Sequence, residues 1–284
     1  MKSVAAALAL AGLCAVAAPY DAVRAKGAFA LQLGHAQADA FLVSQATGAP
    51  PRAHLDLWMT RPGEDTPITA YTVAMTKRIH LIVISDDFRT FLHLHPVLGS
   101  DGHFRLDTAL PRPARYLVYA DAVPEGLNQQ VFRFTLDAGG AGAKPRDLTE
   151  RAATAHVDGY DVSLAQTHVH AFREVALAVR IARSGRPARD LHPYLGALAH
   201  AVFVDAGDLS YVHVHAAARD TGMSELPAMS EMPGMNEPPL RDNATIAPSM
   251  VLRFALPQRG TYKLWLQFRG GGSLHVAPFV LEAT

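Results

Sequence analysis

The sequence predicts an all-β fold made of two tandem antiparallel β-sandwiches. Short runs rich in β-branched and aromatic residues alternate with turn-forming residues along most of the chain. No stretch has a sustained helical period, and one pattern of histidines recurs at a fixed offset. The length of 284 residues suits two ordinary domains.

The first half is predicted to form one β-sandwich over residues 26–137. Its strand-like runs cover residues 41–46, 54–60, 71–84, 90–96, 103–110, 115–122 and 130–136. Residues 138–152 combine Gly, Ala, Pro and charge without an apolar period, which is typical of a linker.

The second half is predicted to form an equivalent sandwich over residues 153–284. Its strand-like runs cover residues 160–170, 174–182, 199–205, 210–216, 249–257, 261–268 and 275–283. The two halves end alike, with Tyr116 corresponding to Tyr262 at an offset of 146 residues. These features indicate an internal duplication of an immunoglobulin-like or cupredoxin-like domain, with an insertion at residues 216–248 of the second copy.

The pattern His-x12-His-x-His occurs once in each half, at an offset of 120 residues. The six histidines are His80, His93, His95, His200, His213 and His215. Each triplet lies on a predicted hairpin, with a turn centred between Asp86 and Asp87 in the first. This register places His80 opposite His93 and His200 opposite His213, with Cβ atoms about 5 Å apart. Three imidazoles would then converge in each copy, which predicts one metal site per repeat.

Other histidines are weaker candidates for the same sites. His103 follows the first triplet and could complete its site, and the final hairpin could bring His275 beside the second triplet. The first-copy counterpart of His275 is Gln129 or Gln130, so the two sites would differ. His168 and His170 form a third His-x-His pair without a repeat equivalent, and their role stays open.

Composition limits the function classes. Basic and acidic residues number 26 each, so no nucleic-acid or membrane-surface partner is indicated. Residues 1–25 are predicted to be a secretory signal peptide, which implies a periplasmic or secreted protein, and no later run is long enough to span a membrane. Cys14 is the single cysteine and lies within that signal, which excludes thiolate-ligated metal centres from the mature chain.

The insertion in the second repeat is rich in methionine, among Pro, Gly, Ser and Glu. The methionines are Met223, Met229, Met232 and Met235. Thioether sulfur is a soft ligand that selects Cu(I), and imidazole accepts both Cu(II) and Cu(I). The sequence therefore predicts copper, ahead of zinc or nickel, although an incidental flexible loop would have a similar composition.

With these features the chain resembles bacterial periplasmic copper-binding and copper-resistance proteins. The resemblance rests on His93-Leu94-His95, His213-Val214-His215 and the segment from Met223 to Met235. It implies a non-enzymatic role in copper homeostasis, in which the triplets hold the ion and the methionines capture or transfer Cu(I). The implied partners are the metal ion and another periplasmic copper carrier or exporter.

Two alternatives stay open at this point. A copper-dependent monooxygenase would also combine tandem β-sandwiches with His-x-His and Met ligands, but it needs an open coordination position and a substrate cleft. A metal-free scaffold or adhesion module would keep its histidines as core residues. A cupin oxygenase is disfavoured because no glutamate follows either His-x-His closely.

Overall fold

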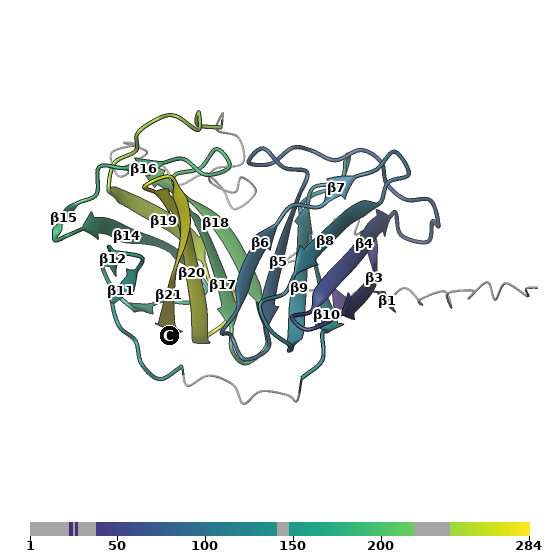
Figure 1. Ribbon diagram of the computed structural model, residues 1–284, viewed down its shortest axis with the longest axis horizontal. Coiled ribbons are helices and arrows are strands. Elements are labelled where there is room, and N and C mark those ends of the chain that lie inside the picture. The colour runs from purple at the N-terminus through teal and green to yellow at the C-terminus, as the bar shows by residue number, and fades with distance from the viewer. Residues whose placement is uncertain (1–22, 25, 28–37, 141–147, 219–238) are drawn as a thin grey trace, which may run out of the picture.

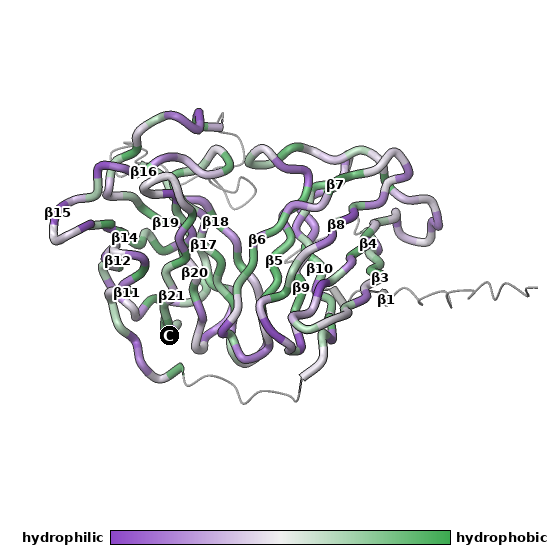
Figure 2. The backbone as a smooth tube through the Cα atoms, in the orientation of Figure 1, coloured by the Kyte–Doolittle hydropathy of each residue, from purple (hydrophilic) through white to green (hydrophobic). Residues whose placement is uncertain are grey.

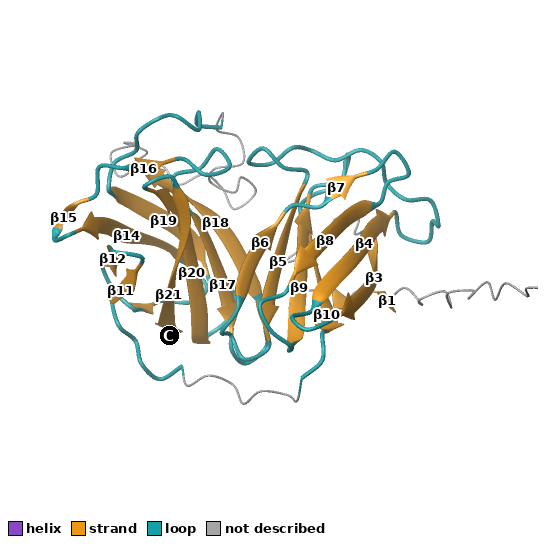
Figure 3. Ribbon diagram, in the orientation of Figure 1, coloured by secondary structure: helices purple, strands orange, loops and turns teal. Residues whose placement is uncertain are grey.

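The computed structural model describes residues 23–24, 26–27, 38–140, 148–218 and 239–284. All regular structure in these ranges is β-strand, joined by loops and turns (Figure 3). The predicted all-β fold of tandem domains is therefore confirmed. Within the same ranges there is no helix that is long and apolar enough to cross a membrane.

The first domain packs two five-stranded sheets against each other (Figure 1). One sheet has the order β1 (Val23–Arg24), β3 (Asp39–Thr47), β4 (Arg52–Thr60), β8 (Phe104–Ala109) and β7 (Val97–Leu98). The other has the order β2 (Lys26–Gly27), β10 (Gln130–Asp137), β9 (Arg115–Ala122), β5 (Ile79–Ser85) and β6 (Phe91–Leu94). All pairings within both sheets are antiparallel.

The second domain has the same two layers, but a long strand joins them. One layer contains β11 (Thr154–Val157), β12 (Tyr160–Leu164), β14 (Glu174–Arg183), β15 (Arg186–Pro187) and β19 (Ser249–Ala255). The other contains β13 (His168–Val169), β16 (Leu191–His192), β17 (His200–Asp205), β20 (Gly260–Gly270) and β21 (Ser273–Ala283). Strand β18 (Tyr211–Ala218) pairs with β17 and with β19, and so links the layers. The short β13 pairs with β21 in parallel, unlike the other strands.

A shared corner motif supports the internal duplication. The Tyr116 hydroxyl donates to the Arg112 carbonyl at 2.6 Å, and the Tyr262 hydroxyl donates to the Gln258 carbonyl at 3.1 Å. Both contacts span four residues, and both use the offset of 146 residues found in the sequence. A tyrosine that bonds back to the preceding turn is a recurrent device of immunoglobulin-like sandwiches.

The two domains pack against each other through their β5–β6–β9 and β17–β18–β20 faces (Figure 1). Strand β5 is buried at all seven positions and β17 at all six, as expected where both sheet faces are covered. The strands carry most of the hydrophobic residues, and the outer loops are more hydrophilic (Figure 2). The buried apolar cluster of this interface comprises Ile82, Ile84, Phe88, Leu117, Tyr119, Val202, Val204 and Trp265.

Interface contacts occur in reciprocal pairs. Phe91 of β6 stacks on Trp265 of β20 at 5.3 Å between ring centroids, and Tyr211 of β18 stacks on Tyr119 of β9 at 4.8 Å. These are equivalent positions exchanged between the repeats. The domains are therefore related by an approximate two-fold axis, as in an isologous dimer.

Some element boundaries differ from the sequence prediction. The predicted run 71–84 is a strand only from Ile79, because Met75 and Thr76 adopt positive φ angles of 44° and 68° in a turn. Strand β10 ends at Asp137 and β11 begins at Thr154, on either side of the predicted linker. Of the predicted signal peptide, the structure describes Val23–Arg24, which pair with β3.

Candidate metal centre between the two domains

Both hairpins have a register two residues away from the predicted one. His93 faces Ile82, and His200 faces His215, so the predicted pairings of His80 with His93 and His200 with His213 are wrong. In the first hairpin the loop is centred between Asp87 and Phe88, one residue later than predicted, and it is closed by a hydrogen bond from Ser85 N–H to the Thr90 carbonyl at 3.2 Å. A shift of two residues preserves the sheet face, so all six histidines still point the same way from their sheets.

Asp87 explains the position of the first turn. Its side chain is fully buried and accepts hydrogen bonds from Ser85 Oγ at 2.6 Å and from Arg89 N–H at 3.3 Å. Phe88 then adopts a positive φ of 56°, which no turn residue in the sequence signals. In the second hairpin, Asp205 Oδ1 accepts from Gly207 N–H at 2.7 Å and from Asp208 N–H at 2.9 Å.

The two triplets form one cluster and not the two separate sites predicted from the sequence. Four rings, two from each domain, lie at its centre: His80, His93, His200 and His213. Centroid distances among these four range from 5.1 Å, between His80 and His93, to 6.1 Å, between His80 and His200. The rings therefore occupy the corners of a rough tetrahedron across the domain interface. His95 and His215 flank it, 4.7 Å from His93 and from His200 respectively.

Backbone carbonyls fix one nitrogen of His80 and one of His200. His80 Nε2 donates to the Ala74 carbonyl at 3.1 Å, and His200 Nε2 donates to the Tyr194 carbonyl at 2.9 Å. These carbonyls are equivalent positions in the two repeats, 120 residues apart. In a neutral imidazole, a proton on Nε2 leaves the lone pair on Nδ1. Both Nδ1 lone pairs therefore point into the cluster.

Side chains of the opposite domain hold the other two central rings. His93 Nδ1 donates to Gln267 Oε1 at 2.8 Å, and His213 Nδ1 lies 3.5 Å from Asp121 Oδ2. Protons on these Nδ1 atoms leave lone pairs on the Nε2 atoms of His93 and His213. The Nε2 lone pairs also point inward.

The inward nitrogens meet at metal-ligand spacing. His80 Nδ1 lies 2.9 Å from His93 Nε2, and His200 Nδ1 lies 3.3 Å from His213 Nε2. Two facing lone pairs repel unless a cation lies between them. Nitrogens bound at about 2.1 Å to one tetrahedral ion are about 3.4 Å apart, close to these distances.

Ligand atoms from both domains approach one another closely. Among the residues that the structure describes, two groups have mutual ligand-atom distances within 4.8 Å: His80 with His93 and His213, and His200 with His213 and His215. The first group mixes the two repeats, and His213 belongs to both. In addition, Nε2 of His95 and Nε2 of His215 are buried without a hydrogen-bond partner. A buried polar atom without a partner is costly, and metal coordination would remove that cost.

Burial keeps five of the six clustered histidines neutral. Burial first, and then the charge of His213, lower the pKa of His80 from 6.5 to about 4. Burial and the neighbouring His80 lower the pKa of His95 to about 3. Burial, followed by neighbouring imidazoles, also holds the pKa values of His93, His200 and His215 well below the ordinary one. At neutral pH these five imidazoles are therefore uncharged, and each has one N–H and one nitrogen lone pair.

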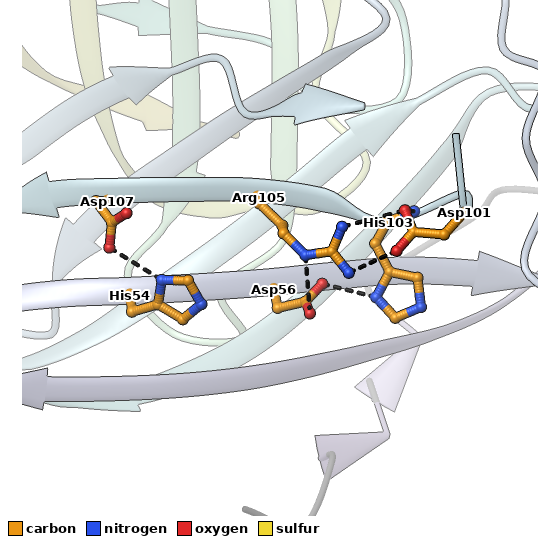
Figure 4. Close-up of polar contacts among 6 residues, drawn as sticks. All are labelled: His54, Asp56, Asp101, His103, Arg105 and Asp107. Carbon is orange, nitrogen blue, oxygen red and sulfur yellow. Dashed lines mark hydrogen bonds and ion pairs between the residues drawn. The ribbon is translucent and has the colours of Figure 1, made fainter. Parts of the chain in front are cut away.

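His103 lies away from the cluster, contrary to the prediction. It stacks on Trp58 at 4.6 Å between ring centroids on the β4–β8 sheet. Its Nδ1 lies 2.7 Å from Asp56 Oδ1 (Figure 4). This sheet is the layer of the first domain that does not carry the triplet. The same surface holds a second pair, in which His54 Nδ1 lies 2.9 Å from Asp107 Oδ1.

His275 is also remote from the central rings. It is paired with Phe268, so it lies on the opposite face of β20–β21 from Trp265 and Gln267. Its Nδ1 lies 2.8 Å from Asp158 Oδ2, and its Nε2 donates to the Gly270 carbonyl at 3.0 Å. His168 and His170 are exposed at β13, with no contact to the cluster among those the structure gives.

Met223, Met229, Met232 and Met235 lie outside the described residues. The described residues on either side of their segment are close to the centre. Strand β18 ends at Ala218, three residues after His215. After the segment, Leu240 N–H donates at 2.9 Å to the carbonyl of Gly196, in the loop that also holds Tyr194.

Sequence reasoning missed Asp121, Gln267 and the Tyr194 loop. Asp121 is paired with His80 on the adjacent strand, and Gln267 is paired with His200. The offset of 146 residues that relates Tyr116 to Tyr262 also relates Asp121 to Gln267. Polar residues at equivalent places in two strands with mostly apolar neighbours were the signal that could have identified them.

Comparisons with known proteins give a family and no described activity. Among curated proteins none matches the sequence. A family model described as a domain of unknown function, DUF8832, matches residues 38–140 and 155–284, which cover both sandwiches. The chain therefore belongs to the DUF8832 family.

Proposed function

We propose that this protein is a periplasmic copper-binding protein that holds one ion between its two domains. The observation that carries the proposal is the convergence of ligand atoms from both domains: those of His80, His93 and His213 lie within 4.8 Å of one another. Four outer contacts, to Ala74, Tyr194, Gln267 and Asp121, fix the imidazole orientations that produce it. Outer partners of this kind are typical of metal-ligating histidines.

A purely structural role fits these imidazoles less well. Core histidines usually satisfy both nitrogens with protein partners, but Nε2 of His95 and Nε2 of His215 have none. A shared proton between His80 and His93 is disfavoured because burial lowers the pKa of both rings. A metal ion binds neutral imidazole, so it satisfies the lone pairs without that penalty.

Copper is favoured over zinc and nickel for two reasons. It forms the most stable divalent complexes with nitrogen ligands, and four roughly tetrahedral imidazoles also suit Cu(I). The methionines of the insertion would supply soft thioether ligands for capture or transfer of Cu(I). Exchange with another periplasmic copper carrier or exporter would then pass through this segment.

Binding is favoured over catalysis by the burial of the centre. His80, His93, His200 and His213 are 1% to 8% exposed, whereas an oxygen-activating site needs an open position and room for substrate. Two surface hollows lie elsewhere, one around Arg61 and Glu125 and one around Arg183 and Asp190. Oxygen consumption with copper and ascorbate, compared with copper alone, would reveal an oxidase.

A copper titration of untagged protein, followed by elemental analysis, tests the proposal. We expect one tightly bound equivalent per chain. His93→Gln and His213→Gln should each abolish it, because both domains contribute ligands to the same ion. His156→Gln is the matched control, since that side chain is 79% exposed and distant in sequence from both triplets.

The number of copper ions bound per chain distinguishes one interdomain site from the two independent sites, one per repeat, that the sequence predicts. Two equivalents, of which each variant loses one, would show independent sites and contradict an interdomain centre. No tight binding, or equal binding by all variants, would leave the cluster a structural feature. Tight zinc binding with weak copper binding would reject copper as the ion.

A further inference from the structure

Asp121 and Gln267 occupy equivalent positions in the two domains, yet one is a carboxylate and the other an amide. Asp121 is 5% exposed and Gln267 is 3% exposed. Each crosses the interface to the first histidine of the other domain's His-x-His pair. The approximate two-fold symmetry of the histidine cluster is therefore broken at Asp121 and Gln267, because one of these side chains is charged and the other is not.

The carboxylate determines the orientation of its histidine more strictly than the amide does. Asp121 can only accept, so it requires the Nδ1 proton on His213 and directs Nε2 into the cluster. Gln267 has both an oxygen and an NH₂ group, so it holds the Nδ1 proton on His93 only because Oε1 is the atom that faces Nδ1. His213 is also the ligand shared by the two closest groups of ligand atoms.

Asp121 also brings a negative charge that its described neighbours do not neutralise. Gln129 Nε2 donates to Oδ1 at 2.6 Å, and the Tyr211 hydroxyl donates to Oδ2 at 3.4 Å. Both donors are uncharged. Among the ion pairs given for the described residues, the partner of Asp121 is His213. A buried carboxylate is stabilised by a nearby cation, and a divalent ion in the cluster would supply it.

We infer that Asp121 is the positioning residue that gives the interdomain centre its preference for a divalent over a monovalent ion. This inference rests on the proposed metal site. The His213 Nδ1–H to carboxylate contact increases the basicity of Nε2, and the added negative charge stabilises Cu(II) more than Cu(I). Gln267 orients His93 without that charge.

The test compares Cu(II) and Cu(I) affinities of the full chain by chelator competition. Asp121→Asn keeps the size and the acceptor oxygen but removes the charge. We expect about 10-fold to 100-fold weaker Cu(II) binding, as for other outer-shell changes, and less than about 3-fold change for Cu(I). The Asp121→Asn/Gln267→Glu double variant moves the carboxylate to the mirror position beside His93 and should recover most of the Cu(II) affinity.

Each other outcome overturns the inference. Unchanged Cu(II) affinity in Asp121→Asn would show that the carboxylate has no role at the centre. Equal weakening of both ions, or no recovery in the double variant, would assign the loss to altered packing. These results would leave the metal site itself intact, whereas a wild-type chain that binds neither ion would overturn the site and this inference together.

Discussion

Acidification should strongly destabilise the metal-free protein, because its buried histidines stay neutral in the folded state. The pKa of His80 is lowered to about 4, against 6.5 for an ordinary histidine. Below pH 6.5 the unfolded chain therefore takes up a proton that the folded chain does not. The free energy of unfolding therefore decreases as the pH is lowered from 6.5 to about 4. His80 alone accounts for about 3 kcal/mol of this decrease, at about 1.4 kcal/mol per pH unit.

Three other well-buried rings add to this effect. His93, His200 and His215 also have lowered pKa values, with burial as the main cause. Between about pH 7.5 and 5.5 each neutral ring lowers the free energy of unfolding by about 1.4 kcal/mol, or about 5 kcal/mol for four. Total stabilities of about 5 to 15 kcal/mol are usual, so we expect the metal-free domains to separate or unfold near pH 5.

Urea denaturation of the metal-free chain at three pH values measures this slope. Fluorescence of Trp265, buried in the interface, reports domain separation. His80→Gln should lower the slope of the free energy of unfolding against pH by the equivalent of about one proton taken up on unfolding. The exposed-site variant His156→Gln should keep the wild-type slope. A free energy of unfolding that stays within about 1 kcal/mol from pH 7.5 to 5.5 would refute the reasoning.

Two further predictions concern the interface and the methionine segment. Trp265→Ala should lower the free energy of unfolding by about 3 to 5 kcal/mol and weaken copper binding, because Trp265 stacks on Phe91 between the domains. Trp58→Ala, on the outer sheet, is the control, and equal urea midpoints for the two variants would contradict an interface role. Changing all four methionines of the insertion to leucine should slow Cu(I) uptake, while Cu(II) binding by the histidines persists; these are Met223, Met229, Met232 and Met235. An unchanged rate of Cu(I) transfer from a chelator would show that the insertion has no role in Cu(I) capture.

Local patterns in the sequence were sufficient for the fold class. Alternating apolar residues and frequent turn residues predicted the strands, and the two offsets of 120 and 146 residues predicted the duplication. The hairpin register was not predictable to the same degree, because it depends on the loop after Ser85 and on the positive φ of Phe88. Bulky residues at positive φ are held by tertiary packing, which local sequence does not specify.

The site was predicted in composition but not in arrangement. All six triplet histidines lie in the cluster, whereas His103 and His275 do not. No residue of the linker indicates which faces of the two sandwiches meet. The useful signal was indirect, since β5 and β17 are apolar at successive positions, as expected for strands covered on both faces.

The approximate two-fold axis has a consequence for how such a centre is assembled. In a homodimer with this interface, the halves would meet only at sufficient protein concentration, and every substitution would appear twice. In a single chain, residues 138–153 tether the halves, so their encounter is intramolecular and independent of dilution. The tandem gene also lets one half change alone. Two positions related by the axis can therefore hold Asp121 in one half and Gln267 in the other, whereas a homodimer would have the same residue at both positions.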